Sequence, residues 1–231
     1  MIRALVAFIF AICLLLCRTA SDAAVSLVQV QCSTSSPVVL ATAPTNGNIV
    51  MGVAGNGASL VGAAFTDSNS VSYMQEEALG NRGGYLGLWD GVVTGSPTAT
   101  YTFSVGTGTQ TYCVYEISGA TLTGAQYVNA ANSGTRSMGI TVPSNAANDF
   151  LLFASIDYQN PMGAAYLSPS TLTVDYPSYT YVFSGHAIAS SSASNVFSIN
   201  IVSTDLAVVF GARYTAVAAG LGSGFIGSSL L

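Results

Sequence analysis

Short apolar runs follow one another along most of the chain after residue 23, separated by clusters of Gly, Ser, Asn and Pro. Val, Ile, Thr, Tyr and Phe dominate these runs, and a helical period is almost absent. Several runs alternate between apolar and polar positions, as in residues 99–105, where Tyr101 and Phe103 are flanked by Thr. Such alternation is typical of a strand with one buried and one solvated face. The pattern predicts an all-β fold.

Nine runs give the clearest strand predictions, with weaker candidates between them. They are residues 25–30, 48–54, 84–90, 99–105, 110–117, 149–156, 180–189, 196–202 and 206–215. Two sheets with one apolar face each pack together as a sandwich. Because no charged or Pro-rich linker divides the chain, we predict a single antiparallel, jelly-roll-like β-sandwich over residues 24–215.

The N-terminal segment, residues 1–23, has a different pattern. Arg3 precedes an unbroken apolar stretch over residues 4–17, and Ser21-Asp22-Ala23 has the small-x-small form of a cleavage site. This order predicts a secretory signal peptide. The apolar stretch ends before Arg18 and is shorter than the roughly 20 residues of a membrane-spanning helix. We therefore expect a secreted protein, extracellular or at the cell surface, with no stable membrane span after signal removal.

Cysteine usage agrees with that compartment. Removal of the signal peptide takes away Cys13 and Cys17 and leaves Cys32 and Cys113, an even pair. Strand alternation puts both thiols on the inward face of their runs. We predict a disulfide, which would stabilise the fold by about 4–5 kcal/mol in the chain-entropy model for a loop of about 80 residues. Two separate buried thiols are the alternative.

Charge is scarce in this sequence. Its 231 residues include five Arg, no Lys and ten acids, for a net charge of −5. High hydrophobicity excludes a disordered chain, and five scattered arginines exclude the basic patch of a nucleic-acid binder. A surface of Thr, Ser, Asn and Gly also lacks the Lys that usually prevents pairing between sheet edges. We therefore expect self-association, or binding to other surface proteins.

The last segment, residues 216–231, is rich in Gly, Ser and Leu and carries no charge. Its glycines and serines interrupt any apolar run long enough to cross a membrane. One interpretation is a final edge strand with a flexible end. The other is an apolar tail that docks on a neighbouring subunit by strand addition.

The order of these features resembles a β-sandwich domain of secreted bacterial and phage-associated proteins, similar in layout to immunoglobulin-like and jelly-roll surface modules. The resemblance rests on residues 27–29 (LVQ), 45–50 (TNGNIV), 65–73 (FTDSNSVSY), 99–103 (ATYTF), 116–119 (EISG) and 146–152 (AANDFLL). The sequence departs from the family pattern at residues 69–71, which lack its Gly-Asn, and at residues 88–90. The resemblance implies a non-catalytic surface module whose ligands are mostly unassigned.

Residues able to carry catalysis or bind metal are few. The single histidine, His186, leaves a catalytic triad one possible base, and the adjacent acids Glu76 and Glu77 would point to opposite sides of a strand. We expect no enzyme activity and no cofactor. Asp67, followed by Ser and Asn, is compatible with a calcium ligand or with an ordinary turn. Glu116 is expected to accept hydrogen bonds that fasten a loop.

Aromatic side chains are the remaining candidates for ligand binding. They are Trp89, Tyr158, Tyr166, Tyr176, Tyr179 and Tyr181. The tyrosines fall in a segment punctuated by prolines, which predicts a long loop region above a rigid sandwich. We expect a secreted, non-enzymatic structural or adhesive protein. The alternative is a carbohydrate-binding module that uses these rings, against which stands simple packing of the rings in the core.

Overall fold

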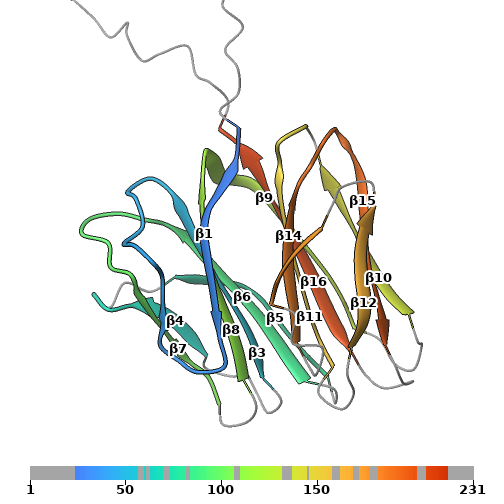
Figure 1. Cartoon of the computed structure of the whole chain (residues 1–231), viewed down its shortest axis with the longest axis horizontal. Helices are drawn as coiled ribbons and strands as arrows, with labels where there is room; N and C mark the ends of the chain where they lie inside the picture. Colours follow the sequence, from blue (N-terminus) through green and yellow to red (C-terminus); the bar gives the residue numbers. More distant parts are fainter. Residues whose placement is uncertain are drawn as a thin grey trace, which may run out of the picture.

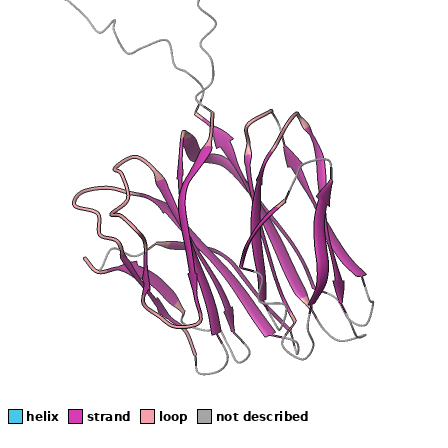
Figure 2. Cartoon of the chain, viewed as in Figure 1, coloured by secondary structure: helices cyan, strands magenta, loops and turns pink. Residues whose placement is uncertain are grey.

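The computed structural model describes residues 24–56, 60, 63–69, 73–81, 84–106, 110–131, 137–144, 146–157, 162–168, 172–176, 182–201 and 207–217. All regular structure in these residues is β-strand, in antiparallel sheets, which confirms the predicted all-β class (Figure 2). None of the described residues forms a helix long and apolar enough to span a membrane. The predicted signal peptide, residues 1–23, and most of the C-terminal segment, 218–231, lie outside the described residues.

The described part of the chain has sixteen strands. The first eight are β1 (Ser26–Ser33), β2 (Val38–Val39), β3 (Ile49–Asn56), β4 (Ala64–Asp67), β5 (Met74–Asn81), β6 (Gly84–Val92), β7 (Thr100–Ser104) and β8 (Gln110–Ser118). The second eight are β9 (Ala120–Ala131), β10 (Ser137–Ser144), β11 (Phe150–Ile156), β12 (Met162–Ser168), β13 (Thr173–Tyr176), β14 (Val182–Ile188), β15 (Ala193–Ile201) and β16 (Val208–Ala216). Each of the nine predicted runs overlaps one of these strands.

The second half of the chain repeats the sheet order of the first. The first half forms a five-stranded sheet, β1-β8-β3-β6-β5, and a three-stranded sheet, β2-β7-β4. Adding eight to each number gives the two sheets of the second half, β9-β16-β11-β14-β13 and β10-β15-β12. The four sheets lie as successive layers, with the two five-stranded sheets in the middle (Figure 1). The predicted single sandwich is therefore wrong, because the strands form two sandwiches stacked on each other.

Three apolar cores fill the spaces between the four layers. The central core joins the two five-stranded sheets, for example through Met51 of β3 and Leu152 of β11. One outer core lies between β3 and the three-stranded sheet of the first half and contains Val50, and the other contains Leu151 of β11. Neighbouring residues of one central strand thus enter different cores. This is why β3 and β11 are apolar on both faces and lack a simple alternation.

The two halves meet with almost no linker. Strand β8 ends at Ser118 and β9 begins at Ala120, and Gly119 between them has a φ of 73°, a conformation that glycine adopts at little cost. Ser26 of β1 is paired with Ser118, and Ala216 of β16 is paired with Ala120. The described chain therefore begins, crosses between halves and ends at one end of the molecule.

Candidate functional site

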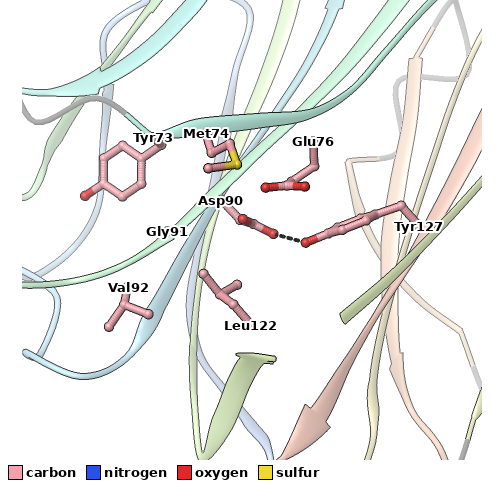
Figure 3. Close-up of a pocket in the computed structure, with 8 residues that line it drawn as sticks. All are labelled: Tyr73, Met74, Glu76, Asp90, Gly91, Val92, Leu122 and Tyr127. Carbon is pink, nitrogen blue, oxygen red and sulfur yellow. Dashed lines mark hydrogen bonds between the residues drawn. The ribbon is translucent and has the colours of Figure 1, made fainter. Parts of the chain in front are cut away.

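A cavity of about 470 Å³ opens at the boundary between the two halves. Its walls come from β5, β6 and the loop before β5 in the first half, and from β9 in the second (Figure 3). The lining residues are Tyr73, Met74, Glu76, Asp90, Gly91, Val92, Leu122 and Tyr127. The site therefore combines two carboxyl groups with walls that are mostly apolar and aromatic.

Asp90 of β6 forms hydrogen bonds with side chains of the second half, inside the molecule. The residue is 1% exposed, and its Oδ2 accepts hydrogen bonds from the hydroxyls of Tyr127 and Tyr214, each at 2.8 Å. Burial raises the pKa of both phenols, so both remain protonated donors near neutral pH. Asp90 Oδ1 is buried. One oxygen of this carboxyl is thus hydrogen-bonded across the interface, whereas the other has, among the described residues, only the Glu76 carboxyl as a possible donor.

Glu76 lies beside Asp90 because of a bulge in β5. Met74 and Gln75 pair with Asp90 and Trp89, the register then shifts, and Glu77 pairs with Leu88, so Glu76 is the extra residue. Figure 3 shows its carboxyl next to that of Asp90. Burial raises the pKa of Asp90, while hydrogen bonds from Tyr127, Tyr214 and Glu76 lower it. Two carboxyl groups can hydrogen-bond to each other only if one of them holds a proton, so the pair favours a shared proton.

The mouth of the cavity is apolar. Met74 is 70% exposed and Val92 is 44% exposed, so both present apolar surface to solvent. The ring of Tyr73 packs over Gly91, where a Cβ would lie 2.7 Å from Tyr73 Cδ1. An incoming group would therefore pass apolar side chains before it reaches the carboxyl pair.

The second half has a matching pair at the equivalent position. Asp175 is the extra residue of a bulge in β13, between Val174 and Tyr176, just as Glu76 is in β5. His186 of β14 pairs with Leu152 of β11, as Asp90 pairs with Met51 in the first half. Asp175 and His186 are therefore the counterparts of Glu76 and Asp90.

The chemistry of this second pair is different. His186 Nδ1 lies 2.8 Å from Asp175 Oδ2 and 3.0 Å from Oδ1, and its ring stacks on Phe150 with centroids 5.5 Å apart. Tyr115, from the first half, is hydrogen-bonded to Ser184 beside them. An imidazole can donate to, or carry a charge opposite to, its carboxylate partner. The first half has a second acid at the corresponding position.

The predicted disulfide is present. Cys32 and Cys113 are paired residues of β1 and β8, and their sulfur atoms are 2.03 Å apart. Cys113 is buried in the central core and Cys32 packs against it. A buried disulfide is compatible with an extracellular protein.

Trp89 does not offer a surface for ligand binding. It is 1% exposed, in the core between β6 and the three-stranded sheet, with its ring edge-on to that of Phe103. We predicted that the Trp89 ring could stack on a sugar. Its burial contradicts that prediction, because stacking requires an accessible ring face. Its position follows from the alternation of β6, in which Leu88 and Asp90 face the central core and Trp89 faces the other way.

The tyrosine-rich segment contains strands where we predicted a long loop. Tyr166 lies in β12 and Tyr176 lies in β13, while Tyr158, Tyr179 and Tyr181 are outside the described residues. Prolines and serines punctuate this segment, but the runs between them are long enough for short strands. A binding role for these tyrosines remains a prediction.

Asp67 and Glu116 both fasten turns. Asp67 Oδ1 accepts a hydrogen bond from the backbone N–H of Asn69 at 2.9 Å, the pattern of an Asx turn. Glu116 accepts hydrogen bonds from Gln29, Asn48 and the backbone N–H of Thr45, which confirms its expected role in holding a loop. Among the described residues no group of three His, Cys, Asp or Glu side chains is arranged to hold a metal ion.

Sequence reasoning singled out Glu76 but missed Asp90. The structure places Asp90 beside Glu76, and Asp175 beside His186. An acid at the end of the apolar run GYLGLWD was the available signal, because such a carboxyl is buried only with partners. The partners themselves come from the other half of the chain.

A scan against protein-family models and a search of curated proteins found no match to this chain.

Proposed function

We propose that the protein is a secreted, non-enzymatic structural or adhesive component of an extracellular surface, built from two jelly-roll-like sandwiches that associate with further copies through sheet edges. The sheet orders and the disulfide support the jelly-roll and extracellular parts of this proposal. The signal-like N-terminus supports export.

The observation that carries the proposal is the absence of charge on four edge strands; β5, another long edge strand, carries Glu76 and Glu77. Strands β1, β9, β10 and β12 each have one strand neighbour in the described sheets, and none of the four contains a charged residue. Edge strands expose unpaired backbone N–H and C=O groups, and soluble proteins usually protect them with Lys or inward-pointing charge. Uncharged edges favour strand-to-strand association.

A charge placed on one edge tests the proposal. Thr141 on β10 is exposed, and its paired neighbour Val196 on the central strand β15 is exposed on the same face. We expect residues 24–231 to form concentration-dependent oligomers in sedimentation velocity, and Thr141→Lys to raise the dissociation constant about tenfold by opposing a second strand.

Val196→Lys is the matched control, because it adds the same charge to the same face away from the edge. Equal effects of the two variants would indicate association through the sheet face, contrary to the proposal. A wild-type chain that stays monomeric up to its solubility limit would also contradict it. Deletion of residues 218–231 in the same assay tests whether the C-terminal segment contributes.

A further inference from the structure

We propose that the cavity between the two halves is a binding site for an alkylammonium group, the cationic end of a free amine or of a lysine side chain, held by Glu76 and Asp90. This site is independent of the proposed edge association. These 231 residues contain no lysine, so a lysine side chain in the cavity would come from outside them.

The comparison between the two halves is the first argument. At equivalent positions the second half places His186 against Asp175, at 2.8 Å, whereas the first half places Asp90 against Glu76. The fold therefore accommodates a basic group beside the bulged acid. In the first half Asp90 stands at the place of that imidazole, so a donor between the two acids is either a proton or an incoming group.

The state of Asp90 is the second argument. Asp90 is 1% exposed and lines the cavity, and among the described residues its Oδ1 meets no hydrogen-bond donor other than the Glu76 carboxyl when that group holds a proton. A buried carboxylate oxygen without a donor costs free energy, and a charged N–H donor would form one of the stronger hydrogen bonds available to it. An ammonium group brings three such donors.

The shape of the cavity selects the rest of the ligand. Exposed Met74 and Val92 form an apolar entrance, and Leu122 adds apolar surface inside. Alkyl chains bury favourably on such surface, and the rings of Tyr73 and Tyr127 suit a cation. Calcium is less suited to these walls, because it takes six to eight oxygen ligands in most sites.

Binding is expected to be coupled to release of a proton. The titratable groups at this site are Asp90 and Glu76, with Tyr73, Tyr127 and Tyr214 around them, and burial raises the pKa of all three phenols. The phenols therefore stay protonated, and the proton lost on binding is the one shared by the two acids. The ammonium group then replaces that proton, so affinity should increase as the pH rises from about 5 to about 7.5.

The test is a calorimetric titration of residues 24–231 at pH 7.5 and pH 5 with butylammonium chloride and with N-acetyl-lysine methylamide. Butan-1-ol, methyl glucoside and calcium chloride are the comparison ligands. We expect both amines to bind, more weakly at pH 5. Tighter binding of the lysine compound indicates a protein partner, and tighter binding of butylammonium indicates a free amine. Equal binding of butan-1-ol or methyl glucoside, or tighter binding of calcium, would overturn the assignment.

Variants locate the site. Glu76→Gln should weaken butylammonium binding about tenfold or more at pH 7.5, and Asp90→His should abolish it by giving the first half the chemistry of the second. Asp175→Asn removes a carboxylate from the equivalent bulge and should leave affinity unchanged. An equal loss in Asp175→Asn and Glu76→Gln would show non-specific charge attraction and refute the site. Chemical-shift changes of the Gly91 amide in the wild-type protein give a readout that needs no variant.

Discussion

Asp90 shows how one buried side chain can make the stability of the molecule depend on pH. Burial raises its pKa above the ordinary value, and the hydrogen bonds from Tyr127, Tyr214 and Glu76 only partly offset this effect. The folded protein therefore holds the proton more tightly than the unfolded chain does. The stability that this proton gives is fully present below the unfolded pKa of about 4 and is lost as the pH rises through the higher folded value.

Asp90→Asn should remove the part of the pH dependence of stability that comes from protonation of Asp90. An asparagine oxygen can still accept from the two tyrosines, while its amide can donate to Glu76 without any proton to lose. In urea unfolding between about pH 4 and pH 8, we expect the wild-type free energy of unfolding to fall relative to that of the variant as the pH rises. Parallel curves for the two proteins would show that Asp90 does not titrate in this range.

Tyr214→Phe should act in the opposite direction in the same experiment. The phenol of Tyr214 donates to the Asp90 carboxylate at 2.8 Å and so favours its charged form. Its removal should raise the pKa of Asp90 further and extend the pH-dependent loss of stability to higher pH. An unchanged profile would mean that the phenol does not influence the carboxyl.

At the scale of elements, the bulges in β5 and β13 decide which acids reach the interior. Regular alternation puts adjacent acids such as Glu76 and Glu77 on opposite faces, and the extra residue of a bulge breaks this alternation locally. Asp175 occupies the same place in β13. A single sequence does not reveal where a bulge occurs, because the bulge depends on the register with β6 or β14.

The strand pair β1–β8 is covalently closed, whereas its counterpart β9–β16 is not. Asn129 and Phe210 occupy in the second half the paired positions that Cys32 and Cys113 occupy in the first. Replacing both cysteines by serine should lower the free energy of unfolding by about 4–5 kcal/mol in the chain-entropy model, because the unfolded chain loses its loop constraint.

Urea unfolding of the double variant checks this value. The wild-type protein unfolded with a reducing agent is the control, and it should lose a similar amount. A double variant as stable as the oxidised wild-type protein would show that strand pairing alone fixes the end of β1.

At the scale of the whole molecule, the two halves share the central core and should unfold together. Trp89, the single tryptophan, lies in the outer core of the first half, and Phe197 lies in the outer core of the second half. Phe197→Ala should remove about 3–5 kcal/mol from the second half. Because neither half can keep its central apolar face buried alone, the melting transition seen by Trp89 fluorescence should also move to lower temperature.

Circular dichroism of the same variant supplies the comparison. A coincident shift in both signals is expected for one cooperative unit. Trp89 fluorescence could instead report unfolding at the wild-type temperature while circular dichroism shows an earlier transition. The two halves would then unfold independently, and contacts in the central core would not couple their unfolding.

The sequence by itself determined the all-β class, the nine clearest strands and the inward direction of Cys32 and Cys113, because these depend on local periodicity and turn residues. The stacking of two sandwiches was decided only by the tertiary structure. Central strands such as β3 and β11 are apolar on both faces, a pattern that one sandwich does not require, and a single residue, Gly119, separates the halves. The juxtaposition of Glu76, Asp90 and Tyr214 likewise required register and packing, since Tyr214 lies 124 residues from Asp90 in the chain and a bulge places Glu76 beside Asp90 (Figure 3).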